Sequence, residues 1–291
     1  MATPSQWLAG ARPRTLPAAV SPIVAGSGAA YIAGRFGALI AVLCLVVALA
    51  LQIGVNYAND YSDGIRGTDA VRVGPMRLVG SGAASPSAGK RAAFASFGVA
   101  ALAGLAVVWL SGHWWLLVVG AAAILAAWFY TGGKHPYGYV GLGELMVFVF
   151  FGLVAVMGTT YVQADRVTAA TFVAAVAVGL VACQVLVANN LRDITGDREV
   201  GKRTLATRLG DRGTRRLYLA MSVVVAAAIV LVAALTSWWA LLGLGGVVIL
   251  VAATRLVIGG AAGRDLISVL QLTGMSELAM SFGLAIGWLI G

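Results

Sequence analysis

Residues 37–63 read GALIAVLCLVVALALQIGVNYANDYSD, an apolar run that ends in two carboxylates. The polar end of this stretch, Asn56 to Asp63, is the first acidic cluster. A second acidic cluster, Asn189 to Asp197, reads NNLRDITGD, and in both clusters an Asp follows an Asn by four residues. The chain has only 11 Asp and Glu, and six of them fall in or just after the two clusters. We infer that these scarce carboxylates are gathered to hold a metal ion.

The composition around the clusters is that of a membrane protein. Hydrophobic residues make up 60% of the chain, charged residues 11%, and mean hydropathy is +0.92, whereas soluble domains carry about 25% charged residues. We therefore predict an all-α, polytopic protein of about nine transmembrane helices around a central cavity, since a spanning helix needs about 20 apolar residues. The predicted segments are 15–33, 37–58, 92–110, 113–131, 144–163, 167–190, 217–236, 238–257 and 266–290.

The distribution of Lys and Arg predicts the orientation. With the N-terminus in the cytoplasm and the C-terminus outside, 18 of the 20 basic residues fall in cytoplasmic segments, as the positive-inside rule requires. We predict one domain over 1–291 in the plasma membrane, with long cytoplasmic loops at about 59–91 and 191–216 that cap the cavity. The net charge of +9 reflects this asymmetry, so a nucleic-acid partner is not expected.

Helical geometry brings the polar residues of each cluster onto one face. Asn56, Asp60 and Asp63 stand at positions i, i+4 and i+7, which lie within roughly 60° of one another on an α-helix. Asn189, Asp193 and Asp197 follow a similar spacing. Mg²⁺ typically takes one or two carboxylates together with waters and substrate phosphates. The two faces therefore predict sites for Mg²⁺ bound to a diphosphate.

Basic residues on the same side of the membrane supply partners for the phosphate oxygens. They include Arg72, Arg77, Lys134, Arg192 and Lys202. The plainer interpretation is that the acids face water and the basic residues only set topology. That interpretation suits one cluster better than two clusters of similar spacing, each followed by basic residues.

Other polar residues leave two readings open. Glu144 either lines the cavity or favours the start of a helix, and Glu277, within the last predicted span, either packs helices or acts in catalysis. Arg14 either binds substrate or anchors the first helix. His113 lies beside two Trp residues at the outer interface, and the two Cys residues predict neither a disulfide nor a zinc site.

Several motifs carry a family resemblance. They are NDYSD at 59–63 with Gly67 and Asp69, RVGP at 72–75, YTGGK at 130–134, PYGYVGLGE at 136–144, NNLRDI at 189–194, DRE at 197–199, GKRTL at 201–205 and RPRT at 12–15. On these residues the chain resembles the UbiA superfamily of intramembrane aromatic prenyltransferases. The superfamily pattern spaces its acids as Asn-x3-Asp-x3-Asp. Here Gly64 occupies the last position and the acid is Asp63, which resembles the branch that acts on naphthoates.

The resemblance implies Mg²⁺-dependent transfer of a polyprenyl group from polyprenyl diphosphate to 1,4-dihydroxy-2-naphthoate. Loss of CO₂ and pyrophosphate would give demethylmenaquinone, in menaquinone biosynthesis. It further implies three sets of residues. The metal ligands are Asn56, Asp60, Asp63, Asp193 and Asp197; the catalytic residues are Asp60, Asp193, Asp197 and Lys202; the substrate-binding residues are Arg14, Arg72, Arg77, Lys134, Tyr139, Glu144, Asn189 and Arg192.

Two alternatives remain. The acceptor could be another aromatic compound, such as 4-hydroxybenzoate. In a different class, an ion or phosphate transporter would use acids along a pathway through both halves of the membrane. The gathering of polar residues on one side of the membrane argues against transport.

Overall fold

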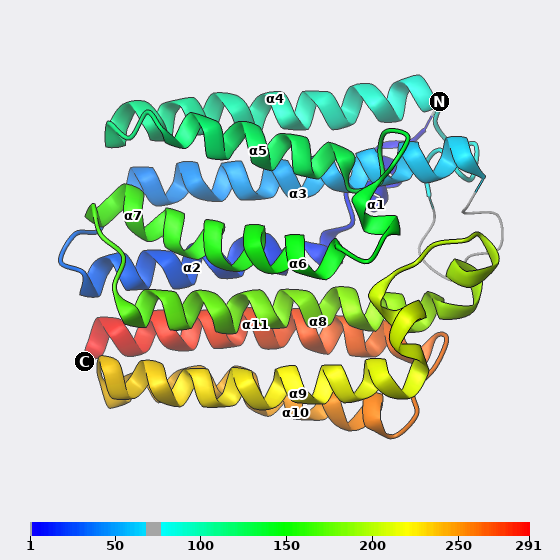
Figure 1. Ribbon diagram of the computed structural model, residues 1–291. Helices are drawn as coiled ribbons and strands as arrows, with labels where there is room; N and C mark the ends of the chain where they lie inside the picture. Colours follow the sequence, from blue (N-terminus) through cyan, green and yellow to red (C-terminus); the bar gives the residue numbers. More distant parts are fainter. Residues whose placement is uncertain (1, 68–76) are drawn as a thin grey trace.

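The computed structural model describes residues 2–67 and 77–291 of the chain. This part of the chain is helical and contains no strand, which confirms the predicted all-α class. The long helices run side by side along one direction, and the two termini lie at opposite ends of the bundle (Figure 1). An odd number of spans, as predicted, places the termini in this way.

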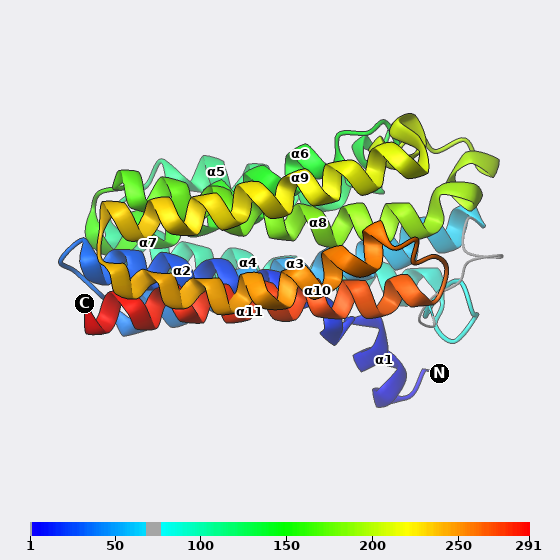
Figure 2. The same ribbon diagram turned by 90° about the horizontal axis from the view of Figure 1, so that it is seen from below.

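The helices follow the predicted segments closely. In chain order they are α1 (Pro4–Gly10), η1 (Pro13–Thr15), α2 (Pro17–Ile32), α3 (Ala38–Arg66), α4 (Pro86–Ser111), α5 (Leu116–Phe129), η2 (Tyr137–Tyr139), α6 (Gly143–Val147), η3 (Phe148–Met157), α7 (Gly158–Ala164), α8 (Ala169–Glu199), α9 (Leu205–Leu235), η4 (Trp238–Gly243), α10 (Leu244–Ile258) and α11 (Asp265–Ile290). The elements α6, η3 and α7 join into one span, and so do η4 and α10. The short helix α1 projects sideways from the bundle (Figure 2).

Among the described residues, seven helices are long and apolar enough to cross a membrane, and an eighth span arises if the N-terminal pair, bent by 50°, counts as one. The remaining predicted segment, 113–131, corresponds to α5. Its 14 residues reach about 21 Å, less than the roughly 30 Å of a hydrocarbon core. Each of the nine predicted segments therefore has a helical counterpart, and α5 is the short one.

The two long loops that were predicted to be cytoplasmic are shorter than predicted, because helices extend into them. α3 continues to Arg66 and ends at Gly67, whose φ of 69° is left-handed. α8 continues to Glu199, and α9 begins at Leu205 and is broken by the non-helical backbone of Gly210. Apolar composition marks where the bilayer ends, and these helices go on beyond that point. Both acidic clusters consequently lie on rigid helix ends.

Packing is uneven across the bundle. The main buried core joins α8, α9, α10 and α11 with part of α2, whereas the core between α3 and α4 is small. Between α2, α3, α4, α5 and the α6–α7 span lies a cavity of about 560 Å³. Its few polar side chains include Gln52, Tyr130 and Tyr137 toward the end that carries the acidic clusters. The half of the bundle formed by α8 to α11 is thus densely packed. The other half, here called the hollow half, encloses the cavity.

Two glycines allow η3 and α8 to cross in close contact. A Cβ on Gly152 would lie 2.6 Å from the Cα of Gly179, and a Cβ on Gly179 would lie 2.9 Å from the Cα of Gly152. Small residues allow membrane helices to approach in this way.

We expect Gly152→Val to force this crossing apart and to lower the melting temperature of the detergent-solubilised protein by roughly 5 °C. The matched control is Gly98→Val, in a helix where an added Cβ meets nothing within 4 Å. Equal melting temperatures for the two variants would contradict the tight crossing.

Candidate functional site

The first acidic cluster lies on the last turns of α3, and Asn56, Asp60 and Asp63 are all buried there. The side-chain amide of Asn56 donates to the carbonyl oxygen of Ala11 at 2.9 Å and to the hydroxyl of Thr15 at 3.0 Å. These contacts fasten the N-terminal segment to α3. Asn56, Asp60 and Asp63 stand on one helix at the predicted spacing. Asn56 also has a structural function, since it holds the N-terminal segment against α3.

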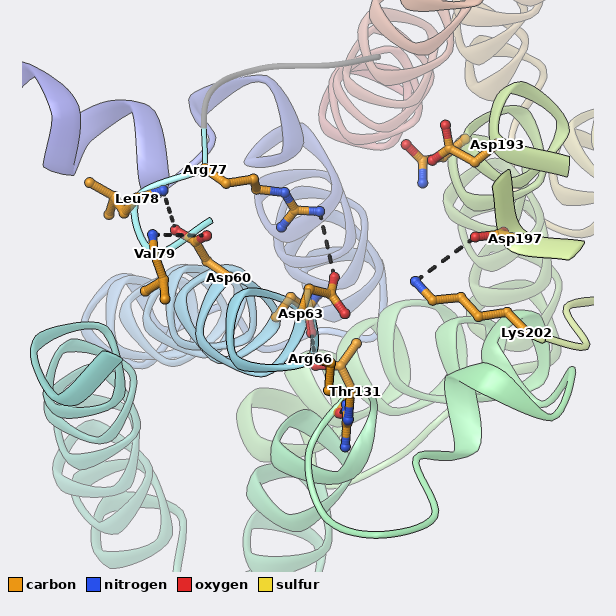
Figure 3. A network of polar contacts seen from close by, with 12 residues as sticks. Asp60, Asp63, Arg66, Arg77, Leu78, Val79, Thr131, Asp193, Asp197 and Lys202 are labelled. Carbon is orange, nitrogen blue, oxygen red and sulfur yellow. Dashed lines mark hydrogen bonds and ion pairs between the residues drawn. The ribbon is translucent and has the colours of Figure 1, made fainter. Parts of the chain in front are cut away.

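The carboxylate of Asp60 accepts two backbone hydrogen bonds from the segment that precedes α4. The N–H of Leu78 donates at 2.7 Å and that of Val79 at 3.4 Å (Figure 3). Asp60 therefore holds this segment against the end of α3. Each carboxylate oxygen has a second lone pair, so holding the segment and binding a metal are compatible functions.

Asp63 lies between Asp60 and the second cluster in the view of Figure 3. The hydroxyl of Tyr139 donates to its Oδ1 at 2.7 Å. An Nη2 atom of Arg77 lies 3.7 Å from its Oδ2. Asp63 thus receives one donor from the loop before α6 and one cation from the segment before α4.

The second acidic cluster lies on the last turns of α8. The guanidinium of Arg192 donates to both carboxylate oxygens of Asp193 at 2.8 Å and to the amide oxygen of Asn189 at 2.9 Å. One turn further on, the carboxylate of Asp197 lies 3.9 Å from the ammonium of Lys202. Each Asp of this cluster has a basic partner from nearby in the sequence.

Tyr139 connects the two clusters. Its hydroxyl binds Asp63, and its ring lies 4.5 Å from the Nζ of Lys202, which in turn faces Asp197. A continuous chain of contacts, here called the bridge, therefore runs from α3 to α8 through Asp63, Tyr139, Lys202 and Asp197. The sequence predicts each of these residues but not that Tyr139 joins them.

The loop at 130–142 holds Tyr139 in place from both sides. On the α3 side, Arg66 donates to the carbonyl oxygens of Thr131 and Gly133 (Figure 3). On the α8 side, the N–H of Arg203 donates to the carbonyl of Tyr139 at 2.8 Å. Within the loop, burial raises the pKa of Tyr137, and its hydroxyl donates to the carbonyl of Ala126 at 2.9 Å. Two anchored ends leave the Tyr139 side chain little freedom to move.

The donor set suits Mg²⁺ shared with a phosphate ligand. The described residues contain no group of three or more His, Cys, Asp or Glu side chains that could enclose a metal alone. Instead, Asp60 and Asp63 on α3 stand across from Asp193 and Asp197 on α8 (Figure 3). Mg²⁺ commonly takes one or two carboxylates and completes its shell with waters and substrate phosphates. The four acids therefore fit that mode of binding.

Glu144 is buried at the start of α6 and faces α8. Its Oε1 accepts a hydrogen bond from the amide of Asn190 at 2.9 Å, and its backbone carbonyl accepts one from the thiol of Cys183. Asn190 adjoins Asn189 of the second cluster. Glu144 is therefore placed to position α8 beneath the acidic cluster.

Two predicted substrate-binding residues are not part of this arrangement, and a third cannot be placed. Arg14 and Lys134 are exposed in the structure. Arg72 lies outside the described residues, as does Asp69. The predictions for these side chains remain predictions.

Some residues of the site were missed from the sequence. Arg66 holds the 130–142 loop, Asn59 accepts a hydrogen bond from Thr131 at 2.7 Å, and Asn190 binds Glu144. Asn59 and Asn190 both lie within the acidic clusters, and the several Asn side chains gathered there could have indicated that they belong to the site. Arg66 carries no such signal, since its partners are backbone carbonyls of a distant loop.

Comparison with known proteins gives a consistent result. The model of the UbiA prenyltransferase family matches residues 19–266. The chain is 52% identical to a 1,4-dihydroxy-2-naphthoate octaprenyltransferase of Mycobacterium tuberculosis, over 98% of this chain and 97% of that protein. It is 43% identical to the Escherichia coli protein of the same name, over 74% of this chain and 72% of that protein.

Solved structures share the fold. A UbiA homologue from Aeropyrum pernix K1 has a TM-score of 0.73 at 17% identity, covering 94% of this chain and 97% of its own. A UbiA homologue from Archaeoglobus fulgidus, bound to GPP and Mg²⁺, has a TM-score of 0.66 at 15% identity, covering 96% of this chain and 98% of its own.

Proposed function

The chain belongs to the UbiA prenyltransferase family, and from that premise we propose that it transfers a polyprenyl group from polyprenyl diphosphate to 1,4-dihydroxy-2-naphthoate. CO₂ and pyrophosphate leave, and the product is demethylmenaquinone in its hydroquinone form. Identity of 52% to a protein named for this acceptor, over almost the whole chain, supports the choice of acceptor. The reaction belongs to menaquinone biosynthesis.

The observation that carries the proposal is the position of the bridge relative to the cavity. Two pairs of carboxylates and their basic partners stand at one end of the bundle. An apolar cavity begins near that end, at Tyr130 and Tyr137, and extends along α2, α3, α4 and α5. A polyprenyl diphosphate has the same division, a charged head on an apolar tail.

Asp60, Asp63, Asp193 and Asp197, with Asn56, would hold Mg²⁺ on the diphosphate. When bound, Mg²⁺ supplies positive charge that stabilises the departing pyrophosphate. The UbiA homologue of Archaeoglobus fulgidus was solved with GPP and Mg²⁺, which supports this cofactor.

The chain's own residues supply the rest. Arg77, Arg192 and Lys202 bind phosphate oxygens and stabilise the charge that develops on the leaving group. Tyr139 places an aromatic face beside Lys202, where a π-system favours a developing allylic cation. Apolar walls hold the tail and keep water from the reacting carbon.

The proposed transfer needs no reactant beyond the prenyl diphosphate and the naphthoate. The C–O bond at C1 of the prenyl diphosphate breaks, and its electron pair leaves with pyrophosphate. The ring carbon that bears the carboxylate forms a new C–C bond to C1. The bond from that carbon to the carboxylate then breaks, CO₂ leaves, and the electron pair restores the aromatic ring.

We propose the plasma membrane as the location, with the acidic clusters in the cytoplasm. The chain is an integral membrane protein of several apolar helices. The termini lie at opposite ends of the bundle, and 18 of 20 basic residues belong to the segments predicted to be cytoplasmic. Alkaline phosphatase is active only outside the cytoplasm. We therefore expect a phosphatase fused after Gly291 to be active, and an inactive fusion would contradict this orientation.

Purified protein in detergent with a polyprenyl diphosphate, Mg²⁺ and 1,4-dihydroxy-2-naphthoate tests the proposal. We expect prenylated, decarboxylated product by mass spectrometry, and its loss when EDTA removes the metal. The same assay with 4-hydroxybenzoate should give little product. Preferential prenylation of 4-hydroxybenzoate would refute the choice of acceptor, and no product with either would refute the function.

Replacing Tyr139 separates its two contacts. Tyr139→Phe keeps the ring beside Lys202 but removes the hydrogen bond to Asp63, and we expect kcat to fall roughly 10-fold. Tyr139→Leu removes both contacts, and we expect roughly a 100-fold fall. The measurement is the initial rate at saturating substrates. The control is Tyr31→Phe, at the C-terminal end of α2 and away from the acidic clusters. Full activity in Tyr139→Leu would contradict the bridge.

A further inference from the structure

Three carboxylates of the site each have a basic partner from this chain. Asp193 receives two guanidinium hydrogen bonds at 2.8 Å, Asp63 has Arg77 at 3.7 Å, and Asp197 has Lys202 at 3.9 Å. The Arg192 side chain is 4% exposed and that of Arg77 12%. Attraction between such poorly hydrated charges is stronger than between charges at a solvated surface.

Of the three basic residues, Arg192 contacts the most oxygen atoms that could bind a metal in the second cluster. Its guanidinium contacts Asn189 and Asp193 together. These are two of the oxygen-bearing groups whose i, i+4 spacing predicts a metal site. The guanidinium of Arg192 thus binds the same oxygens that a metal at this position would need as ligands.

A bare divalent cation would meet two obstacles at this site. It would have to displace a bidentate guanidinium and lose part of its hydration shell, which Mg²⁺ gives up reluctantly. The displaced Arg192 would then be a poorly hydrated charge without its carboxylate, which is costly.

A diphosphate removes both obstacles. Its oxygens offer guanidinium and ammonium groups a bidentate anionic partner, so Arg77, Arg192 and Lys202 can exchange a carboxylate for a phosphate. The freed carboxylates then face the metal that the diphosphate carries.

We propose that this exchange of ion pairs makes metal and diphosphate bind as one unit and excludes the metal alone. Arg192 is the positioning residue that enforces the coupling. The inference rests on the proposed function and adds a property of the same site, namely that metal affinity depends on the diphosphate.

Equilibrium dialysis of the full-length protein in detergent tests the coupling, with Mn²⁺ as the metal probe and inorganic pyrophosphate as the anion. Dialysis lets the Mn²⁺–pyrophosphate complex equilibrate on both sides, so excess Mn²⁺ on the protein side is bound metal. We expect the wild type to bind Mn²⁺ at least about 10-fold more tightly with pyrophosphate than without it. Equal binding in both conditions would overturn the inference.

Arg192→Gln should reverse the dependence. We expect it to bind Mn²⁺ without pyrophosphate at least about 10-fold more tightly than the wild type, and to gain less from pyrophosphate. Arg216→Gln, which removes the same charge from an exposed position on α9, should behave like the wild type. Wild-type metal affinity in a folded Arg192→Gln would overturn the inference, as would an equal gain in Arg216→Gln.

The wild-type comparison does not depend on any variant folding. Tight binding of Mn²⁺ alone, with product still formed, would overturn the coupling and leave the proposed function intact. Absence of Mn²⁺ binding even with pyrophosphate would overturn both.

Discussion

Asp193→Asn is expected to lower the rate of prenyl transfer on the order of 1000-fold. The carboxylate lies on α8 across from Asp63 (Figure 3), and Arg192 donates to both this carboxylate and Asn189. An amide of the same shape keeps one oxygen but loses the negative charge that a hard cation requires. Loss of one preorganised charge contact at a leaving group typically costs 100- to 1000-fold in kcat, and loss of metal affinity adds to it.

The measurement is product formation at increasing Mg²⁺, by mass spectrometry. The matched control is Asp211→Asn, an exposed Asp on α9 paired with Arg215. That variant should keep wild-type activity. If Asp193→Asn retained more than a tenth of the wild-type rate, the second cluster would not be the metal site.

Lys202→Gln is expected to lower kcat roughly 100-fold. Lys202 is the cation of the bridge, since its ammonium lies against both Asp197 and the ring of Tyr139. On departure of pyrophosphate, this charge stabilises the leaving oxygens. Gln fills a similar space without charge. Lys202→Arg should recover part of the rate, because it restores the charge with a different shape.

Lys90→Gln provides the control for this prediction. Lys90 is also a lysine over an aromatic ring, at 5.9 Å from the centroid of Trp128, but it belongs to α4 and lies outside the bridge. Its replacement should leave kcat unchanged. A fall in kcat common to both variants would indicate a general effect of charge at this membrane face, contrary to the proposed function of Lys202.

The positions of the acidic clusters could be predicted because helical periodicity is a local property. Four-residue spacing on an apolar run placed Asn56 and Asp60 on one face, and the structure confirms it. The nine predicted spans, an odd number, similarly predicted termini at opposite ends of the bundle. Both results depend on neighbours in the sequence and on the bilayer.

The partners of the acids could not be predicted in the same way. Asp60 meets backbone N–H groups of Leu78 and Val79, and any residue type supplies such groups. Arg192, predicted to bind a diphosphate, donates in the structure to Asn189 and Asp193 of its own helix, contacts that the sequence did not predict. A long flexible side chain has several reachable anions, and tertiary packing decides among them.

The hollow half of the bundle has a consequence for turnover. On the proposed function, the tail of the product moves from an apolar protein wall to the bilayer interior, two media of similar polarity, so this step releases little free energy and requires little. The lining of the cavity of about 560 Å³ is thus similar in polarity to the lipid interior. On the same proposed function, the charged pyrophosphate must leave Arg77, Arg192 and Lys202 for water, so its release requires more free energy than release of the tail.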